Sequence, residues 1–331
     1  MNDDKAPLLE VRGLTTEFVS ERGGVRRAVR AADDVSFDIG RGEILALAGE
    51  SGSGKSVTAL SVIRLVPPPG RIVSGSIRFE DRELLALGEA ELRRVRGARI
   101  GFVFQEPMTA LNPAFAVGDQ IAEALEVHGV ATGAAARGRA VELLDAVRIP
   151  DPARRARDFP HQLSGGMRQR VLIAAAIACR PPLVIADEPT TALDATVQAD
   201  ILDLLAAMRR EIGLSLLLIT HDLGVAGRVA DRVAVMYAGR IVEVGPAPGV
   251  LASPRHPYTR GLLASLPGRV PGARLEAIPG AGPDLAALPP GCAFAPRCPD
   301  VFAACGASRP GASAVSPGHT ARCFLHGEGT R

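Results

Sequence analysis

Hydrophobic and polar positions alternate with a period of two in the first forty residues. The segments LLEVRGL and VSFDI each alternate, and the turn-forming ERGG stands between them. Side chains along a strand point to opposite faces in turn, so this pattern predicts short strands joined by a turn. The apolar segment EILALAG follows and runs directly into a glycine-rich stretch. We expect this segment to be a buried strand.

From residue 109 to about residue 180 the apolar positions recur every three to four residues, as in VGDQIAEALEVHGV and GRAVELLDAVRI. This period predicts amphipathic helices. ARIGFVFQEP, PLVIADEP and LSLLLITHD are short apolar runs of the kind that forms strands buried on both faces. The segment DILDLLAAMRREIG predicts a helix that ends at Gly213, and RVAVMYAGRIVEVGP predicts a hairpin that turns at Ala238 and Gly239. Strands that alternate with helices indicate an α/β fold.

The composition changes after about Pro246, where proline and glycine become frequent. A short helix, PYTRGLLASL, is expected there, before a segment that holds four of the five cysteines. We therefore predict a boundary near residues 246–256. The two predicted domains are residues 1–250, with a helical part at about 109–180, and a loop-rich tail at 251–331.

The bulk properties exclude some classes of protein. The chain has 331 residues, 47% of them hydrophobic, and a formal charge of +2, which is too low for a strongly basic nucleic-acid binder. The first residues, MNDDKAPLLE, lack the apolar region of a secretion signal. The longest apolar run, Val171 to Cys179, falls far short of the roughly 20 residues of a membrane span. We expect a soluble chain that meets a membrane only through partners.

The stretch GESGSGKS matches G-x-x-x-x-G-K-[ST] and stands between a predicted strand and a helical run. Glycines let the main-chain N–H groups face an anion, and the following helix N-terminus adds partial positive charge. Lysine occurs only at Lys5 and Lys55, so a lysine in this loop is notable in an arginine-rich chain. The alternative is an ordinary glycine-rich turn. The residues expected to bind a nucleotide are Gly49, Glu50, Ser51, Gly52, Ser53, Gly54, Lys55, Ser56 and Val57.

Polar residues end three further apolar strands: Gln105, the pair Asp187 and Glu188, and His221. In α/β folds ligands bind at the carboxyl edge of the sheet, so these residues suit a nucleotide–Mg²⁺ site. One carboxylate can serve Mg²⁺ and the other can polarise a water molecule. Taken singly, each has a structural alternative: a helix-capping acid pair, or a hydrogen-bonding glutamine or histidine.

A second candidate anion site lies in HQLSGGMRQR. Ser164 is a good N-cap, and Gly165 and Gly166 expose main-chain N–H groups at the start of the helix predicted to follow. An ordinary capped helix is the alternative. The question is why one chain would carry two phosphate-binding devices more than a hundred residues apart.

Taken in order, these motifs resemble those of the ATP-binding cassette (ABC) ATPases: GESGSGKS, FVFQEP, LSGGMRQR, LVIADEP, TALD at residues 191–194, and ITHD. The resemblance implies a P-loop α/β fold, with a RecA-like mixed sheet, an antiparallel β subdomain and a helical subdomain. It also implies that two cassettes pair head to tail, so that each ATP lies between the glycine-rich loop of one and the LSGGMRQR segment of the other. The second device would then serve the partner's nucleotide.

The resemblance assigns roles residue by residue. Phe18 would stack on adenine, and Ser56, Gln105 and Asp187 would hold Mg²⁺. Glu188 would be the general base, His221 would hold the γ-phosphate, and Gln105 would sense it. The residues expected at the partner's nucleotide are Ser164, Gly165, Gly166, Gln169 and Asp194.

Several longer segments, among them FQEPMTALNP, ADEPTTALDATVQA and SPRHPYTRGLLASLP, resemble the ATPase subunits of bacterial dipeptide and oligopeptide importers, the D-type dipeptide subunit in particular. That resemblance implies a second ATPase chain, two permeases and a solute-binding protein as partners, with this chain at the cytoplasmic face of the membrane. Related machines import nickel, glutathione or opines. The alternative is a soluble ABC ATPase acting on DNA or ribosomes, which the single cassette and its short insert disfavour.

The tail cysteines, Cys292, Cys298, Cys305 and Cys323, show neither zinc-ribbon nor ferredoxin spacing. A chain that uses ATP works in a reducing compartment, which disfavours disulfides. Some importers that the chain resembles carry a 4Fe-4S cluster at these cysteines, which is our expectation; zinc and no metal are the alternatives. His256 and His319 are expected to be surface or capping residues, and Cys179 a core residue.

Overall fold

The structure is a computed structural model that describes residues 6–22, 25–191, 193–266 and 277–326. The chain forms two compact units. Unit 1 consists of Met1–Ile39, Ile44–Leu85 and Ile219–Arg331, and unit 2 of Gly40–Glu43 and Ala86–Leu218. The boundary predicted at residues 246–256 lies within unit 1 and stays a prediction about the domains of the sequence.

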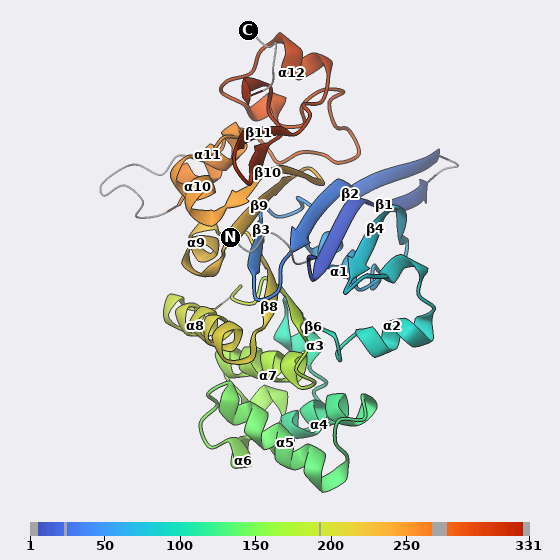
Figure 1. Cartoon of the computed structure of the whole chain (residues 1–331), viewed down its shortest axis with the longest axis vertical. Helices are drawn as coiled ribbons and strands as arrows, with labels where there is room; N and C mark the ends of the chain where they lie inside the picture. Colours follow the sequence, from blue (N-terminus) through green and yellow to red (C-terminus); the bar gives the residue numbers. More distant parts are fainter. Residues whose placement is uncertain (1–5, 23–24, 192, 267–276, 327–331) are drawn as a thin grey trace. The chain divides into compact units, whose positions relative to one another are not determined.

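An antiparallel sheet forms one part of unit 1, with strand order β2-β1-β4-β5 (Figure 1). Its strands are β1 (Leu9–Arg22), β2 (Val25–Ile39), β4 (Gly70–Phe79) and β5 (Arg82–Glu83). The prediction of short strands was wrong in length, because β-bulges between Val11 and Glu17 carry β1 through Gly13 without ending it. A bulge adds a residue and bends a strand while the pairing continues on either side. The turn expected at ERGG includes residues 23–24, which lie outside the described residues.

A mixed sheet forms the other part of unit 1. Strand β3 (Ile44–Ala48) pairs parallel with β9 (Arg232–Tyr237), and β9 pairs antiparallel with β10 (Arg240–Pro246). The predicted hairpin is confirmed: Ala238 and Gly239 have φ of 47° and 80°, as a two-residue primed turn requires. Two tail strands that the pattern did not predict, β12 (His319–Ala321) and β11 (Ser313–Ser316), extend this sheet from β10.

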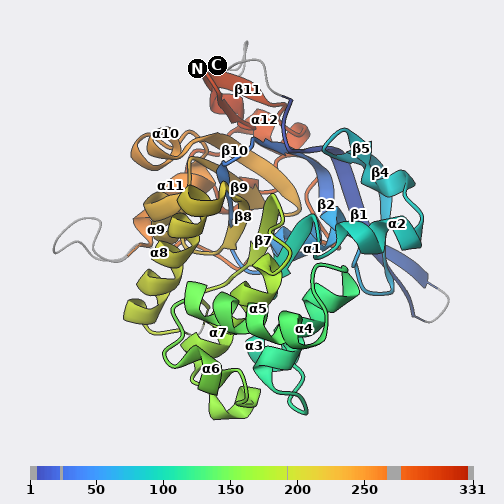
Figure 2. The ribbon, with the colours of Figure 1, turned by 60° about the horizontal axis from the view of Figure 1, so that its bottom comes forward.

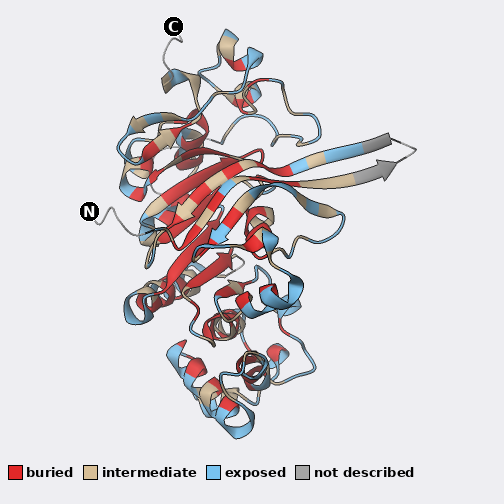
Figure 3. Ribbon diagram, turned by 45° about the vertical axis from the view of Figure 1, so that its right-hand side comes forward, coloured by how far each residue is buried: buried red, intermediate tan, exposed pale blue. Residues whose placement is uncertain are grey.

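The tail of unit 1 shares a hydrophobic core with the mixed sheet. Val233, Val235 and Tyr237 of β9 are buried in one cluster with Tyr258 and Phe294 of the tail. Figure 3 shows the strands at the centre of the view as largely buried. The predicted short helix is confirmed as α11. The helices of unit 1 are α1 (Lys55–Val62), α9 (Leu223–Val229), α10 (Ala247–Ala252), α11 (Pro257–Ala264) and α12 (Ala303–Ala307).

Unit 2 combines parallel strands with a group of helices. Strands β6 (Ile100–Val103) and β7 (Leu183–Asp187) pair in parallel, and β8 (Ser215–Thr220) begins in this unit. Helices α4, α5 and α7 pack together (Figure 2), which confirms the helical pattern seen in the sequence. The helices are α2 (Glu89–Val95), α3 (Pro107–Ala110), α4 (Val117–Val127), α5 (Gly133–Ala146), α6 (Pro152–Arg155), α7 (Gly165–Ile177) and α8 (Ala195–Ile212).

Helix α8 ends as predicted, with Gly213 in the left-handed conformation at φ 67°. Its 18 residues make it the longest helix of unit 2. No helix in the described part of the chain is both long and apolar enough to cross a bilayer.

Candidate active site

The glycine-rich loop of unit 1 connects the fully buried strand β3 to the N-terminus of α1. Gly49 and Gly54 have φ of 154° and 104°. A Cβ atom at Gly49 would lie 2.2 Å from the Met236 carbonyl oxygen, and one at Gly54 would lie 2.0 Å from that of Ala31. Both positions therefore require glycine, for backbone conformation and for space.

Lys55 lies over this loop. Its side chain is buried, and its ammonium group donates hydrogen bonds to the carbonyl oxygens of Gly49, at 2.8 Å, and Glu50, at 3.0 Å. Ser53 is 3% exposed, and its hydroxyl has no hydrogen-bond partner among the described residues. A compact positive charge, main-chain N–H groups at a helix start and an unsatisfied buried hydroxyl together make a cradle that fits phosphate groups.

Phe18 and His221 also belong to unit 1. Phe18 lies on β1, opposite Val29 of β2 and Gly70 of β4. Its half-buried ring covers Gly70, where a Cβ atom would lie 2.7 Å from Phe18 Cε1. His221 is exposed and follows the end of β8, next to Asp222, which caps α9.

Unit 2 brings three polar side chains together at the carboxyl ends of β6 and β7. Gln105 Nε2 donates a hydrogen bond of 3.3 Å to Glu188 Oε2, and the Thr191 hydroxyl donates one of 2.8 Å to the same oxygen. Asp187 is buried beside them in the chain, with 6% of its surface exposed. The expectation that strand-end polar residues meet at one sheet edge is confirmed for Gln105 and Glu188. Thr191 was missed as a contact of this carboxylate, because only the local turn brings it there.

Glu188 has an unusual backbone conformation, with φ of 46°. A non-glycine residue in the left-handed region costs on the order of 1–3 kcal/mol and persists where the surrounding structure imposes it. Such strain is concentrated at functional sites. The turn after β7 thus holds the Glu188 carboxylate toward Gln105 and Thr191, the arrangement expected of a fixed base.

The LSGGMRQR segment begins α7, and its cap is the one expected. The Ser164 hydroxyl accepts a hydrogen bond of 3.3 Å from the Met167 N–H. Ser164 and Gly165 are exposed, and Gly166 allows close packing, since a Cβ atom there would lie 2.6 Å from Val197 Cγ1. Gln169 is 2% exposed, and its amide nitrogen has no partner among the described residues. The exposed helix start can receive a phosphate from outside the chain.

Asp194 caps the neighbouring helix α8. Its carboxylate accepts hydrogen bonds from the N–H groups of Thr196, at 3.1 Å, and Val197, at 3.0 Å. Val197 is also the residue against which Gly166 packs. The two segments predicted to meet the partner's nucleotide are therefore in contact within unit 2.

The four tail cysteines line one cavity of unit 1, together with Phe302 and Phe324. Burial raises the pKa of Cys292 and of Cys323, and it raises that of Cys298 to about 11. In the described ranges, no three or more His, Cys, Asp or Glu side chains converge as metal ligands. The expected 4Fe-4S cluster is therefore not confirmed: its four cysteines line one cavity, but they do not converge as ligands in the described residues.

Other side chains in or near the tail have structural roles. His256 Nδ1 accepts a hydrogen bond from the Tyr258 N–H, which confirms a cap at the start of α11. His319 is buried and hydrogen-bonds Glu243 at 2.8 Å, so it is not a surface residue. Cys179 is only partly buried and contacts the Ala124 carbonyl oxygen, rather than lying in the core.

Comparison with known proteins agrees with this site. Residues 32–191 match the model of the ABC transporter family, and residues 242–305 match the oligopeptide/dipeptide transporter C-terminal region. The dimeric ATP-binding cassette MJ0796, solved in a post-hydrolysis state with ADP and phosphate, is 30% identical with a TM-score of 0.64. The match spans 72% of this chain and 98% of the MJ0796 chain. The cbiO1 protein of Clostridium perfringens is 27% identical with a TM-score of 0.62, over 75% of this chain and 92% of cbiO1.

The chain thus belongs to the ATP-binding subunits of ABC transporters, and it is an ATPase with the P-loop α/β fold of that family. Relatives within the family carry names that refer to peptide transport. A putative peptide import ATP-binding protein of Brucella melitensis is 50% identical over 97% of both chains. The dipeptide transport ATP-binding protein DppD of Bacillus subtilis is 49% identical over 96% of this chain and 94% of its own length.

Proposed function

We propose that this chain is the ATP-hydrolysing subunit of an importer of dipeptides or oligopeptides. The observation that carries the proposal is the similarity to peptide-import ATP-binding proteins over nearly the whole chain, tail included. The structural support is the Gln105–Glu188–Thr191 arrangement, which fixes a carboxylate at a strand end. Nickel, glutathione or opine import by the same machinery is the alternative, because the solute-binding protein selects the cargo.

In the proposed mechanism the loop at residues 49–57 and Lys55 bind the ATP phosphates, and Phe18 stacks on the adenine. Ser56, Gln105 and Asp187 would hold Mg²⁺, which neutralises phosphate charge. Glu188 accepts a proton from the attacking water as the water oxygen bonds to the γ-phosphorus, and the bond from that phosphorus to the ADP oxygen breaks. His221 contacts the γ-phosphate. Closure then requires a second cassette, which supplies the helix start of its own LSGGMRQR-type segment to this nucleotide.

The partners in this proposal are a second ATPase chain, two membrane permeases and a solute-binding protein. The exposed start of α7 supports a partner cassette, because an exposed helix N-terminus can receive a phosphate held by another chain. The chain would lie at the cytoplasmic face of the inner membrane, held there through the permeases.

The test uses the Glu188→Gln variant, which should bind ATP but hydrolyse it ~10²–10⁴-fold more slowly. The tagged variant is extracted from its host's membranes in mild detergent with ATP, and the co-purifying proteins are identified. Two multi-span permeases and a second cassette would support the proposal. A chain that remains in the soluble fraction, alone or with ribosomes, would contradict it.

The cargo is tested separately, by uptake. Cells that lack this chain are complemented with wild type or Glu188→Gln, and the uptake of a labelled dipeptide, a labelled pentapeptide and ⁶³Ni²⁺ is compared. Restored uptake of either peptide by wild type alone supports peptide import. Restored nickel uptake without peptide uptake would contradict peptide import and favour nickel as the cargo.

An iron–sulfur cluster in the tail is a separate proposal, which the resemblance implies. It is supported by one observation, that the four cysteines line a single cavity. The lack of converging ligands in the described residues stands against it. Iron and acid-labile sulfide measured on anaerobically purified protein decide the matter: about four of each per chain is the composition of such a cluster. Protein without iron or sulfide would refute it, and zinc alone would favour the zinc alternative.

A further inference from the structure

The tail of unit 1 holds Glu50, the second residue of the phosphate loop. The Arg297 guanidinium donates to both carboxylate oxygens of Glu50, at 2.7 and 3.0 Å. The Arg297 side chain is 7% exposed and that of Glu50 is 30% exposed, so the pair is shielded from water on the arginine side. A two-pronged Arg–carboxylate pair fixes both distance and orientation. The hydrogen bonds to Glu50 raise the pKa of Arg297 further above its usual range.

A second contact holds the main chain at the same residue. The Glu50 N–H donates a hydrogen bond of 2.8 Å to the hydroxyl of Tyr258, which is fully buried. This N–H group is therefore engaged by the tail and is not turned toward a phosphate. Glu50 is expected to lie at the nucleotide with the rest of the loop, and these contacts also make it the point where the loop is anchored.

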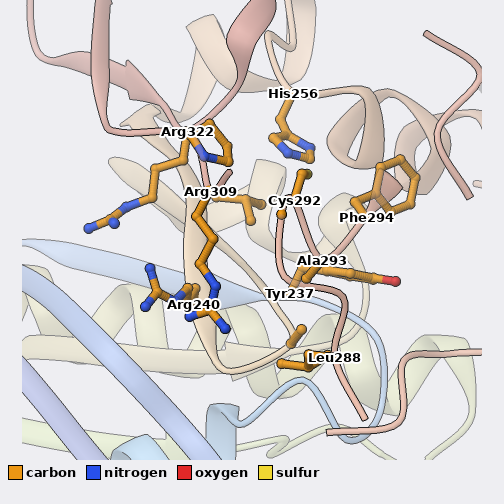
Figure 4. A pocket seen from close by; sticks show the side chains of 13 residues that line it. Tyr237, Arg240, His256, Leu288, Cys292, Ala293, Phe294, Arg309 and Arg322 are labelled. Atoms are coloured by element: carbon orange, nitrogen blue, oxygen red, sulfur yellow. The ribbon is translucent and has the colours of Figure 1, made fainter. Parts of the chain in front are cut away.

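The tail residues that make these contacts are themselves held firmly. Tyr237, Tyr258 and Phe294 form an aromatic cluster with ring centroids 4.5 to 5.4 Å apart. The Arg297 guanidinium lies 5.9 Å from the Tyr237 ring centroid, and its Nε donates to the Pro279 carbonyl oxygen. Figure 4 shows the tail segment of Cys292, Ala293 and Phe294 beside Tyr237 and His256, where they line one pocket.

The start of α11 is fixed by a buried carboxylate. Glu243 of β10 is 1% exposed and accepts hydrogen bonds of 2.8 Å from the N–H groups of Arg255 and His256. His256 then caps the helix through the Tyr258 N–H. These bonds set the position of the Tyr258 ring, so its hydroxyl reaches the loop from a rigid base.

The loop needs such an anchor because of its composition. Gly49, Gly52 and Gly54 all have positive φ, and glycine has more freedom to lose on ordering than any other residue. If a loop becomes ordered only on binding, the lost conformational entropy lowers its affinity for the ligand. A loop that is already ordered before binding avoids this loss. The contacts at Glu50 lie at the start of the loop, opposite the end that α1 secures.

We propose that Arg297 and Tyr258 are positioning residues of the ATP site, which act through Glu50 to hold the phosphate loop in its binding conformation. The proposal rests on the proposed role of this loop in binding ATP. It assigns to the C-terminal tail a direct part in ATP affinity.

The test is ATP binding by the full chain, in the Glu188→Gln background to prevent turnover, with Mg-ATP titrated at equilibrium. Arg297→Gln should raise the Kd for ATP about tenfold, because the net free energy of a hydrogen-bonded charged pair corresponds to a change of about that size in an equilibrium constant. Tyr258→Phe, which removes only the hydroxyl, should raise Kd about threefold, as for one neutral hydrogen bond. Arg297→Lys keeps the charge without the fork and should give an intermediate Kd.

Arg309→Gln is the matched control. Arg309 is also a tail arginine that binds a carboxylate outside the tail, Asp33 of β2, at 3.0 Å, but it does not contact the loop. Its Kd should stay within about twofold of the parent value, the usual result for a partly exposed pair. A similar rise in Arg309→Gln and Arg297→Gln would mean that the tail acts only through general stability, and it would overturn the proposal.

A double-mutant cycle with Glu50→Gln tests whether Arg297 acts through Glu50. If it does, the Kd of the double variant for ATP should not exceed the higher of the two single-variant Kd values. Independent roles would instead give additive losses of binding free energy. With Glu188 restored, the Arg297→Gln protein should show a raised KM for ATP and a kcat within about twofold of wild type, because only binding is affected.

Two outcomes separate this proposal from the one on which it rests. If Lys55→Ala also binds ATP normally, the loop itself has been misassigned. If Lys55→Ala fails to bind but Arg297→Gln and Tyr258→Phe both keep the parent Kd, the loop binds ATP without help from the tail and the present proposal is wrong. Tyr258→Phe preserves the aromatic core and keeps the test valid if Arg297→Gln fails to fold.

Discussion

The Thr191 hydroxyl donates a 2.8 Å hydrogen bond to the Glu188 carboxylate, three residues before it in the chain. Removing this bond in Thr191→Val should lower kcat about tenfold, because hydrogen bonds to charged groups contribute roughly 1.5–3 kcal/mol. The KM for ATP should change less than about twofold, since the role proposed for Glu188 lies in the chemical step rather than in binding. Steady-state ATPase kinetics measure both constants. Thr191→Ser keeps the hydroxyl and should behave like wild type; if it loses as much activity as Thr191→Val, the hydrogen bond is not the cause.

Gly54 and Gly52 provide a matched pair for testing the loop. Both have positive φ, but a Cβ atom at Gly54 would meet the Ala31 carbonyl oxygen at 2.0 Å, while one at Gly52 meets nothing within 4 Å. Gly52→Ala should reduce the free energy of unfolding by about 1 kcal/mol, for the backbone strain alone. Gly54→Ala should cost about 3 kcal/mol or more, or prevent folding, since main chain must move. Urea denaturation compares them, and equal losses would contradict the steric explanation.

Phe18 is expected to stack on the adenine ring of ATP. Base–aromatic stacking is worth roughly 1–3 kcal/mol, so Phe18→Ala should raise the KM for ATP by about five- to a hundredfold. Phe18→Tyr keeps the aromatic face and should leave KM within about twofold of wild type. Because the ring also covers Gly70, circular dichroism and thermal unfolding are compared for both variants. An unchanged KM in a folded Phe18→Ala protein would remove Phe18 from the site.

His256 gives the fold a dependence on pH. Burial lowers its pKa to about 3, with smaller electrostatic contributions from Arg260 and His326, while an unfolded histidine titrates near 6.5. The unfolded chain therefore binds the extra proton between these values, and stability falls as pH decreases through that window. From pH 6.5 to pH 5 the free energy of unfolding should fall by about 2 kcal/mol from this residue.

The matched variant is His256→Asn, which can still cap α11 but does not titrate. The difference between wild type and variant, measured by urea denaturation at several pH values, isolates the histidine from the carboxylates that titrate in both. Above pH 7 the two curves should run parallel. Parallel curves below pH 6 as well would show that His256 is not held neutral in the fold.

Local patterns predicted much of this structure. The buried strands, the cap at Ser164, the end of α8 at Gly213 and the hairpin at Ala238 and Gly239 each depend on residues close together in sequence, and each is confirmed. The ordered set of motifs is enough to identify the family, because each motif is a fixed spacing of residues that one turn or strand end requires.

Long-range contacts account for most of what the sequence did not predict. Nothing near Arg297 or Tyr258 marks either residue as a partner of Glu50, since folding alone brings the tail to the loop. The strands β11 and β12 are short; β12 pairs with the edge that β10 offers, and β11 then pairs with β12. The length of β1 was not predicted for a local reason. Its bulges interrupt the alternation of polar and apolar residues, although the pairing with β2 continues on both sides of them.

The separation of Glu50 and Arg297 by 247 residues also has a meaning for how the protein is made. A ribosome releases the phosphate loop early and then synthesises all of residues 86–218, which form a unit of their own. The residues that secure the loop emerge only after that. During synthesis the nascent cassette therefore carries its complete glycine loop without the contacts from Arg297 and Tyr258. The proposed role of these residues implies that tight ATP binding is acquired only once the tail has been translated.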